Sequence, residues 1–381
     1  MNACVDQRIV VPFDFPVIFA DHVFSAQNAA LHEALVRLGD AARPRAMLYI
    51  DANAAAAMPE LAASAIAWCG KWNITLAAPP HIIAGGEAVK NDWGATRGLI
   101  QEMLDVHLDR HAFVIIIGGG AVLDAVGFAA SLVHRGLRVV RIPSTALSQC
   151  DSGVGVKTGI NFAGGKNSIG TFAPPFAVLN DFQFLLTLPD RDWRAGVAEA
   201  FKVAIIRDRA FFDFLCENTR AFRERREAPM RSLVRRCAEL HLDHIRTGGD
   251  PFEMGRSRPL DFGHWSAHKL ELLSDFRIGH GDAVAAGVAL DSAYAAIQGW
   301  ISHKDFLLIH RVLLECGFPL WQREMDDPRL LDGLREFQEH LGGALCVTFP
   351  SELGHRREES VMNPDGIRAS LQRLKALAHT L

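Results

Sequence analysis

The segment at residues 111–136, HAFVIIIGGGAVLDAVGFAASLVHRG, constrains the fold more than any other. It places an apolar strand, the glycines Gly118, Gly119 and Gly120, and a helical pattern in direct succession. A strand that turns through glycine into a helix is typical of nucleotide-binding units, because the free amides at the helix N-terminus can hold a pyrophosphate. The motif differs from G-x-G-x-x-G, so it also fits a tight turn that binds nothing.

The neighbouring sequence repeats the alternation of strand and helix. Residues 45–51 (RAMLYID) and 138–144 (RVVRIPS) are short apolar runs typical of buried strands, and helical patterns separate them. Such alternation predicts a parallel sheet with helices on both faces. Asp51 ends the first of these strands, where it can bind a ribose or lie exposed in a turn. A further helix is expected to begin near Glu87.

The pattern of the chain changes near Asp190. Beyond it, long amphipathic helical patterns follow one another with hardly a strand between them. We therefore expect an α/β domain with a parallel sheet over residues 1–188 and a mostly α-helical domain over residues 189–381. The length of 381 residues, of which 49% are hydrophobic, suffices for two cores.

Composition excludes several classes of partner. A formal net charge of −4 gives no basic face for a nucleic acid. The N-terminus lacks the pattern of a secretory signal, and Asp124 with the three glycines interrupts the most apolar run, so we expect no membrane contact. The seven cysteines include no C-x-x-C pair, which indicates reduced thiols in a cytoplasmic protein.

Residues 142–175 read as an unusually long irregular segment, which is generally functional inside a compact domain. The segment carries Asp151, Lys157, Lys166 and Asn167 among many glycines and hydroxyl residues. These groups can offer cations and amides to an anion, and a carboxylate to a hydroxyl. The alternative interpretation is a flexible surface loop.

The second half contains candidate metal ligands. Glu199 and Lys202 lie three residues apart in an apolar helical pattern, either as a surface ion pair or as a partly buried pair in which Glu199 is a ligand or base. His264 and His268 share one helix face, and His280 lies between two glycines before another helix. Single histidines are usually structural, but three histidines and a glutamate suit zinc. Spacing alone favours His264 and His268 as ligands. Either Glu199 or His280 would be the third.

Six segments resemble the sugar phosphate cyclases, whose best-known member is 3-dehydroquinate synthase. In order they are GGGAVLDAVGFAASLVHRG, IPSTALSQCDSGVGVKTGIN, GGKNSIG, AGVAEAFK, DFGHWSAHK and GHGDAVAAG. The resemblance runs from about residue 51 to residue 280, and more weakly to the C-terminus, and it implies a dinucleotide-binding domain followed by a helical metal-binding domain. It also implies bound NAD, a divalent metal that is usually zinc, and a homodimer that acts on a small sugar phosphate.

The resemblance also implies roles for individual residues. Glu199, His264 and His280 are expected to bind the metal, which places His268 on the phosphate side instead. The residues implied in catalysis are Asp151, Lys157, Lys202, Glu253 and His268. Those implied in substrate binding are Arg135, which would reach the neighbouring subunit, and Asn167, Lys166, Asp243, Ser257, Asp261 and His340. Those implied in NAD binding are Asp51, Asn53, Glu87, Lys90, Gly119, Gly120, Asp124, Ser144 and Thr145.

The chemistry of the resembled family accounts for these residue types. NAD first oxidises a ring hydroxyl that the metal makes more acidic. Phosphate then leaves by β-elimination, NADH returns the hydride, and an intramolecular aldol step closes a carbocycle. Because the cofactor performs the redox steps, a basic pocket and one metal suffice.

Three positions depart from the pattern of 3-dehydroquinate synthase, whose heptulosonate substrate carries a carboxylate. Asp243 stands at a lysine position, Ser257 at an arginine position and Asp261 at an asparagine position. These changes remove two positive charges and add two negative ones, so we expect a carboxylate substrate to be rejected. Arg256 and Arg258 lie nearby and could compensate.

Cyclases that act on sedoheptulose 7-phosphate fit better, because that substrate lacks the carboxylate and aspartates accept hydrogen bonds from sugar hydroxyls. The sequence D-F-G-H at residues 261–264 resembles synthases of 2-epi-5-epi-valiolone, while the retained His268 favours a 2-epi-valiolone synthase. His340 stands where the family has a phosphate-binding lysine. The alternatives are a true 3-dehydroquinate synthase and a metal-dependent NAD polyol dehydrogenase.

Overall fold

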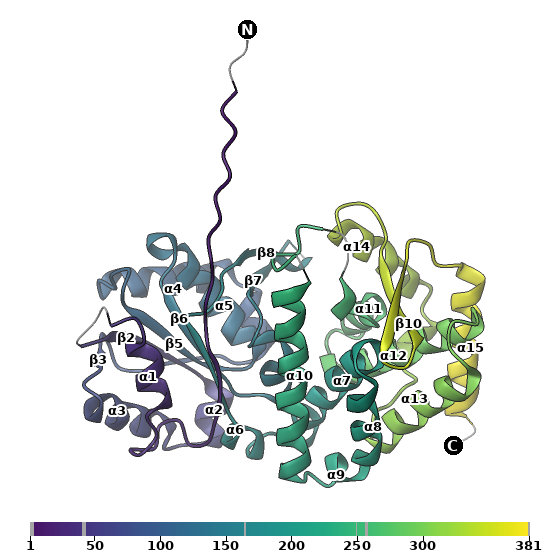
Figure 1. The fold of residues 1–381 in the computed structure, drawn as a ribbon, viewed down its shortest axis with the longest axis horizontal. Helices are drawn as coiled ribbons and strands as arrows, with labels where there is room; N and C mark the ends of the chain where they lie inside the picture. Colours follow the sequence, from purple (N-terminus) through teal and green to yellow (C-terminus); the bar gives the residue numbers. More distant parts are fainter. Residues whose placement is uncertain (1–3, 40–42, 164, 249, 256–257, 380–381) are drawn as a thin grey trace.

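In the N-terminal half of the chain, seven strands form a parallel sheet. The computed structural model describes residues 4–39, 43–163, 165–248, 250–255 and 258–379 of the whole chain. The strands lie in the order β1-β9-β6-β5-β2-β3, with β4 beside β2. Figure 1 labels β3, β2, β5 and β6 of this sheet. The bounds of the strands are β1 Val17–Ala20, β2 Arg45–Asp51, β3 Thr75–Leu76, β4 His81–Ile83, β5 Phe113–Gly118, β6 Arg138–Pro143 and β9 Ala177–Asp181. Their pairings are parallel.

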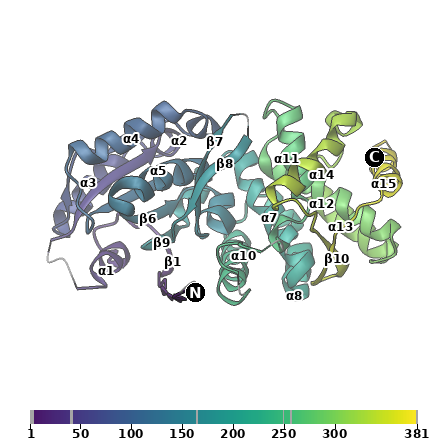
Figure 2. The same ribbon diagram turned by 90° about the horizontal axis from the view of Figure 1, so that it is seen from above.

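Helices cover both faces of this sheet. They are α1 Ala30–Val36, α2 Ala52–Ala57, α3 Leu61–Lys71, α4 Trp93–Asp105, α5 Gly120–Leu132 and α6 Gln183–Leu186. Successive residues of β2 point to opposite faces, so Leu48 shares a core with α1 and α3, whereas Tyr49 shares another with α4 and α5. Figure 2 shows α1 and α4 on opposite sides of the sheet. The predicted α/β architecture with a parallel sheet is thus confirmed.

The segment at residues 142–175 is not an irregular loop, which corrects the prediction from sequence. Its elements are the π-helical turn η3 Ser148–Ser152 and the antiparallel strands β7 Lys157–Phe162 and β8 Gly165–Phe172. The hairpin packs on α5, where a Cβ on Gly127 would lie 2.9 Å from Cγ2 of Thr158. The glycine therefore permits an approach that no pattern within the hairpin itself reveals.

The helix expected near Glu87 is a short 3-10 helix, η1 Glu87–Lys90. The following α-helix, α4, begins only at Trp93, because Asp92 accepts a hydrogen bond of 2.7 Å from the amide of Gly94 and caps the helix. A further 3-10 turn, η2 Val133–Arg135, ends α5.

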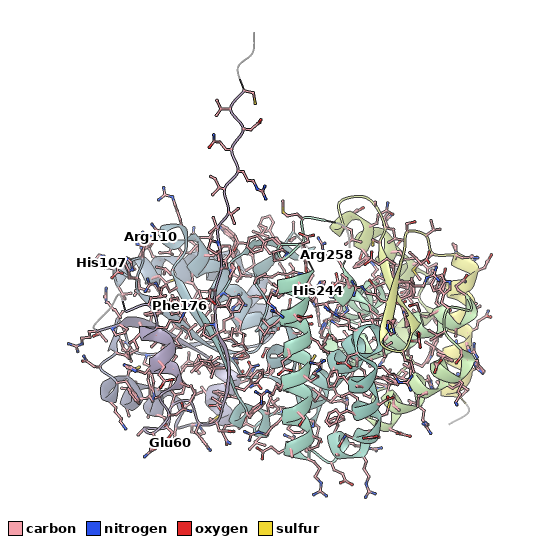
Figure 3. All side chains as sticks on the ribbon, viewed as in Figure 1. Glu60, His107, Arg110, Phe176, His244 and Arg258 are labelled. Atoms are coloured by element: carbon pink, nitrogen blue, oxygen red, sulfur yellow. The ribbon has the colours of Figure 1, made fainter. Side chains whose placement is uncertain are left out.

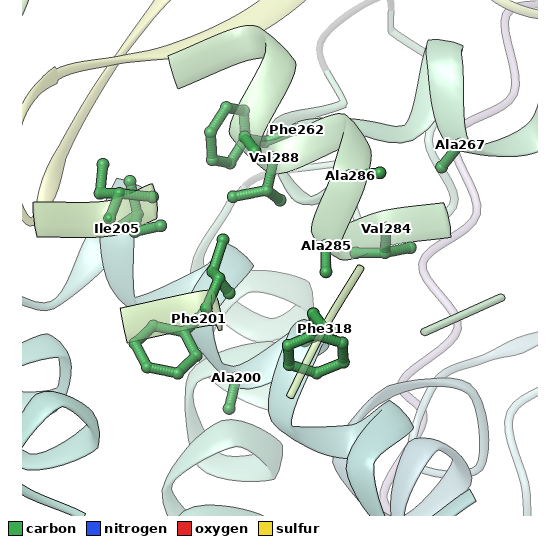
Figure 4. Close-up of a cluster of buried hydrophobic side chains, with 14 of the residues drawn as sticks. Ala200, Phe201, Ile205, Phe262, Ala267, Val284, Ala285, Ala286, Val288 and Phe318 are labelled. Carbon is green, nitrogen blue, oxygen red and sulfur yellow. The ribbon is translucent and has the colours of Figure 1, made fainter. Parts of the chain in front are cut away.

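The C-terminal half is mostly helical, as predicted, and packs around one large apolar core. Phe201 of α7, Phe262 before α11 and Val288 of α12 lie in that core (Figure 4). The helices are α7 Asp190–Arg207, α8 Arg209–Glu217, α9 Thr219–Arg223, α10 Glu227–Thr247, η4 Pro259–Asp261, α11 His264–Leu273, α12 His280–Ile297, α13 His303–Glu315, η5 Arg323–Asp326, η6 Pro328–Leu331, α14 Asp332–His340 and α15 Pro364–Ala378. An antiparallel pair, β10 Val347–Glu352 and β11 His355–Glu359, adds strands that the sequence did not indicate.

The predicted boundary at residues 188–189 falls in the link between α6 and α7. The division into two domains there stays a prediction. Within the described chain, no helix combines the length and the apolar character that crossing a bilayer requires. All seven cysteines are free thiols, as predicted.

Candidate functional site

Three helices bring a glutamate and two histidines together. Glu199 lies in the middle of α7, His264 is the first residue of α11, and His280 is the first residue of α12. The Nε2 atoms of His264 and His280 lie 3.7 and 3.4 Å from Oε1 of Glu199. Tetrahedral zinc, with bonds of about 2.0–2.1 Å, separates its ligand atoms by roughly 3.3 Å, so the spacing of these three side chains fits a single zinc ion. The group formed by Glu199, His264 and His280 is called the metal cluster below.

Glu199 is a buried, ionised carboxylate, which favours the binding of a cation. Its side chain is fully buried, and its Oε1 atom accepts no hydrogen bond from any described residue. Its Oε2 atom lies 2.5 Å from Nζ of Lys202, which is also buried, so the pair is internal and not a surface ion pair. Burial raises the pKa of Glu199, but Lys202 and His280 together outweigh it and hold the pKa below its ordinary value.

The start of α11 is fixed from the side of α12. Gly263 has a φ of +78°, and a Cβ there would lie 2.7 Å from a backbone nitrogen of α12, so glycine is required just before His264. Asp291 accepts hydrogen bonds from the amide of Gly263, at 3.0 Å, and from Nε1–H of Trp265, at 2.8 Å. These contacts place the His264 ring at the helix N-terminus beside Glu199.

His268 lies next to the metal cluster. Its ring centroid is 5.2 Å from that of His264 and 5.9 Å from that of His280. A second group with ligand-like spacing consists of His268, Glu271 and His280. Among the described residues neither group holds His264 and His268 together, so the ligand pair that spacing alone favours does not form.

A cavity of about 450 Å³ opens beside the metal cluster between the two halves of the chain, and it is called the substrate cavity below because residues that are expected to bind substrate line it. Two acid–base pairs lie in it: Nζ of Lys157 is 2.6 Å from Oε2 of Glu253, and Nζ of Lys202 is 3.3 Å from Oδ2 of Asp151. The predicted site residues that line it are Asp124, Asp151, Lys157, Asn167, Lys202, Glu253, Asp261 and His264.

His241 was not identified from the sequence. Its Nδ1 atom lies 3.1 Å from Oδ1 of Asp151, so Asp151 is held between His241 and Lys202. Burial lowers the pKa of His241 despite the nearby Asp151, and burial together with Arg207 lowers the pKa of His244 to about 4. Both histidines line the substrate cavity from α10. Their spacing of three residues on one helix was the available signal.

The loop that carries Glu253 is folded around Arg258. The guanidinium donates hydrogen bonds to the carbonyl oxygens of Gly255, at 2.8 Å, and Glu253, at 2.6 Å, and its Nε atom lies 3.0 Å from Oε2 of Glu253. Glu253 itself has a φ of +50°, which these contacts help to hold. Figure 3 shows Arg258 and His244 near one end of α10, on the side of the substrate cavity.

A second cavity of about 730 Å³ lies where β2, β5 and β6 end, and it is called the dinucleotide cavity below because residues that are expected to bind NAD line it. The N-terminus of α5 borders it, and a Cβ on Gly120 would lie 2.6 Å from Oγ of Ser152, so a larger residue there would require the serine hydroxyl to move. Free amides at such a helix N-terminus suit a pyrophosphate. The predicted site residues that line it are Asp51, Asn53, Glu87, Gly119, Gly120, Ser144, Thr145 and His280. Because His280 borders this cavity and His264 the other, the metal cluster lies between the two.

Two predicted NAD contacts occupy a different place. Lys90 is buried, its Nζ atom lies 2.8 Å from Oδ2 of Asp124, and it also donates a hydrogen bond to Asn167. Asp124 and Asn167 border the substrate cavity, whereas Lys90 is not among the described residues that line either cavity. These three residues connect η1, α5 and β8.

Several predicted substrate-binding residues lie away from the described linings of both cavities. Arg135 is exposed at the end of η2. Asp243 lies 3.5 Å from Nη2 of Arg207 and 2.9 Å from Nη2 of Arg246. Lys166 is paired with Glu271. Their predicted contacts with a substrate stay predictions. Outside the described residues lie Ser257, Arg256 and the side chain of His340.

Glu271, which was not predicted from the sequence, is a further candidate for a functional role because it contacts the candidate metal ligand His280. It is only 4% exposed, and its Oε2 atom lies 3.1 Å from Nδ1 of His280. Burial lowers the pKa of His280, but Glu271 and Glu199 outweigh it and raise the pKa to about 9. A metal ion that bound to this ring would have to displace a proton from it. The available signal was position, since Glu271 follows His264 by seven residues on one helix face.

Two family models match the chain in succession. The model described as 3-dehydroquinate synthase N-terminal matches residues 80–195, and the model described as 3-dehydroquinate synthase C-terminal matches residues 196–337. A curated relative, the 3-dehydroquinate synthase of Alkaliphilus metalliredigens (strain QYMF), is 34% identical over 278 residues, which are 73% of this chain and 77% of the relative.

Solved structures share the same two-part fold. ValA, the 2-epi-5-epi-valiolone synthase from Streptomyces hygroscopicus subsp. jinggangensis 5008 with NAD+ and Zn2+ bound, is 26% identical with a TM-score of 0.88 over 98% of this chain and 100% of its own. A 2-deoxy-scyllo-inosose synthase complexed with carbaglucose-6-phosphate, NAD+ and Co2+ has a TM-score of 0.74 at 20% identity, over 94% of this chain and 96% of its own, and shows the fold alone.

Proposed function

The chain belongs to the 3-dehydroquinate synthase family within the sugar phosphate cyclases, and we propose that it converts sedoheptulose 7-phosphate to a seven-carbon cyclitol with release of phosphate. The product would be 2-epi-valiolone or 2-epi-5-epi-valiolone. NAD and a divalent metal, most simply zinc, would be its cofactors, in keeping with the NAD+ and Zn2+ bound to ValA. Homodimer formation and a cytoplasmic location remain part of the proposal.

The observation that carries the choice of substrate is the engagement of Arg258. A heptulosonate phosphate presents a carboxylate, which requires a cation of the cavity that can turn toward it. The Arg258 guanidinium instead binds the Glu253 carboxylate and the carbonyl oxygens of its own loop. It therefore supports the loop and does not replace the arginine expected at Ser257.

The remaining charges of the substrate cavity point the same way. Lys157 is paired with Glu253, and Lys202 is held by Glu199 and Asp151. Asp261 adds a further carboxylate to the lining. A cavity whose cations are already balanced by its own acids favours a hydroxyl-rich end of the substrate over a carboxylate.

The cofactors and the chain would divide the chemistry. When bound, NAD would take up and return a hydride, and the metal would lower the pKa of a ring hydroxyl. Glu199, His264 and His280 would hold the metal between the two cavities. Asp151, held by His241, would accept a hydrogen bond from a substrate hydroxyl. Lys157 would bind the substrate beside Glu253.

The second candidate function is 3-dehydroquinate synthase. The name of the curated relative at 34% identity favours it. The overall similarity to ValA, at a TM-score of 0.88 over almost the whole of both chains, supports the conversion of sedoheptulose 7-phosphate instead. The substrates of the two functions differ in one group: the heptulosonate phosphate carries a carboxylate, and sedoheptulose 7-phosphate does not.

One experiment separates these candidates. The purified protein, supplied with NAD and Zn2+, is incubated with sedoheptulose 7-phosphate or with the heptulosonate phosphate, and inorganic phosphate is measured. Release only from sedoheptulose 7-phosphate is expected, and NMR of the product then assigns its stereochemistry. Release only from the heptulosonate phosphate would overturn the proposal. Accumulation of NADH in proportion to product would indicate a polyol dehydrogenase, because a cyclase shows no net NADH.

A further inference from the structure

A line of polar contacts connects the β7–β8 hairpin with the metal cluster. Nζ of Lys166, in β8, lies 3.1 Å from both carboxylate oxygens of Glu271, in α11. Oε2 of Glu271 lies 3.1 Å from Nδ1 of His280, whose Nε2 faces Oε1 of Glu199 at 3.4 Å. The line joins a strand of the N-terminal half to a residue that would bind the metal.

We infer that Glu271 is a positioning residue that orients the ring of His280 toward the metal, and that Lys166 holds Glu271 in place for this purpose. This inference rests on the proposed function, because it requires a metal bound by His280. Glu271 itself would not touch the metal. Its effect would pass through the imidazole of His280.

The chemistry of imidazole explains why a carboxylate belongs at this position. A neutral histidine that binds a metal through Nε2 carries its proton on Nδ1, and a hydrogen bond from that N–H to a carboxylate fixes both the tautomer and the ring orientation. Glu271 is the acceptor that meets Nδ1 of His280. His280 sits at the first position of α12, where no preceding helical turn restrains its ring.

Lys166 stabilises the buried, charged carboxylate of Glu271. Glu271 is 4% exposed, and a buried carboxylate without a cation would be strongly destabilising. The two contacts at 3.1 Å balance its charge. Since Asn167, the next residue of β8, lines the substrate cavity, the hairpin contacts both the substrate cavity and the support of the metal ligand. A shift of the hairpin should therefore change metal affinity.

The same residues allow one competing arrangement. His268, Glu271 and His280 also lie within metal-binding distance of one another. A metal in that group would make Glu271 a direct ligand and would leave Glu199 unnecessary. The two arrangements make opposite predictions for substitutions at Glu199 and Glu271.

The test measures Zn2+ affinity by competition with a chromophoric chelator, using full-length metal-free protein without substrate. The variants are Glu271→Ala, Glu271→Gln, Lys166→Met and Glu199→Gln. The controls are Glu324→Gln, a buried glutamate paired with Arg277 and Arg323, and Lys269→Met, a lysine of α11 paired with Glu336. Circular dichroism confirms that each variant is folded.

The expected results are graded. Glu271→Ala should weaken Zn2+ binding by about 10- to 100-fold, the usual effect of removing such a carboxylate. Glu271→Gln, which keeps an acceptor without the charge, should lose less, and Lys166→Met should also lose affinity. Both controls should bind as the unsubstituted protein does, and Glu199→Gln should lose nearly all binding.

Other results would overturn the inference. If both Glu271 variants bind Zn2+ as the unsubstituted protein does, or if Glu324→Gln loses as much affinity, Glu271 has no specific role, while the proposed function stands. If Glu271→Ala abolishes binding and Glu199→Gln does not, the metal occupies the competing group. If the unsubstituted protein binds no Zn2+, this inference and the proposed function both fail.

Discussion

The guanidinium of Arg258 and the carboxylate of Glu253 form an ion pair, with Nε of the arginine 3.0 Å from Oε2 of the glutamate. The same arginine donates a hydrogen bond to the carbonyl oxygen of Glu253, whose backbone has a φ of +50°. A single side chain therefore holds both the backbone and the carboxylate of Glu253, which is also paired with Lys157 in the substrate cavity. Because the guanidinium of Arg258 binds Glu253 and Gly255, it stabilises the loop and is not available to bind the substrate.

Replacing Arg258 with alanine should therefore slow turnover of sedoheptulose 7-phosphate more than it weakens substrate binding. Glu253 would lose its support, and we expect kcat to fall roughly 10- to 100-fold, with a smaller change in KM. Steady-state phosphate release measures both constants. Arg246→Ala, an exposed arginine paired with Asp243, is the control and should leave them unchanged. A rise in KM alone would instead indicate that Arg258 binds the substrate.

Asp261 is expected to exclude carboxylate substrates. It lines the substrate cavity at the position where the resembled synthase has asparagine. Asp261→Asn removes a negative charge, so release of phosphate from the heptulosonate phosphate should rise by about 10-fold, which corresponds to roughly 1.4 kcal/mol of lost repulsion. Asp243→Lys should add little, because Asp243 faces Arg207 and not the cavity. Equal gains from both substitutions would contradict this assignment.

The fold was predictable where contacts are local in sequence. The strand, glycine turn and helix at residues 111–136 lie as predicted, because apolar periodicity and a helix N-terminus are encoded by neighbouring residues. The β7–β8 hairpin was missed because its position depends on the close contact of Thr158 with Gly127 of another element. Nothing in the alternation of residues 157–172 indicates that contact.

The site was predictable in part for a related reason. Resemblance to the family pointed to Glu199, His264 and His280, and the helices bring these residues together. The partners Glu271 and His241 were missed because each acts through a contact between elements, to His280 and to Asp151. The rotation of α10 about its axis, which is set by packing, also decides that His241 faces the cavity.

Lys202 is expected to be essential for stability before any ligand binds. It is 1% exposed and contacts both Glu199, at 2.5 Å, and Asp151, at 3.3 Å. Lys202→Met removes the nearer of the two cations beside the buried Glu199 carboxylate and leaves only His280, so the free energy of unfolding of the metal-free protein should fall by up to about 3–5 kcal/mol. Urea denaturation measures this loss.

The loss in Lys202→Met should shrink when Zn2+ is present, because the metal would replace the missing positive charge beside Glu199. Lys375→Met, which breaks an exposed pair with Asp326, is the matched control and should cost less than about 1 kcal/mol. A Lys202→Met protein as stable as the unsubstituted chain would show that the pair is not required for folding.

Asp291 should make the protein less stable as the pH rises from about 4 to about 7. It is fully buried, and burial raises its pKa to about 7, although hydrogen bonds from Trp265 and Gly263 act in the opposite direction. In the unfolded chain an aspartate titrates near pH 3.9. Between these two values the unfolded chain has released the proton while the folded protein keeps it, so the free energy of unfolding falls, by roughly 2–4 kcal/mol over the whole window.

The substitution Asp291→Asn isolates this contribution, because asparagine stays neutral in both states while other titrating groups remain the same. Urea denaturation at pH 5, 6, 7 and 8 should show the variant gaining stability relative to the unsubstituted protein as the pH rises, with no further gain above pH 8. Asp327→Asn is the control, since exposed contacts with Arg329 lower the pKa of Asp327 to about 2, outside this range. Its stability curve should run parallel to that of the unsubstituted protein. A parallel curve for Asp291→Asn would mean that Asp291 is already ionised in the folded state and that the start of α11 is held by a buried charge.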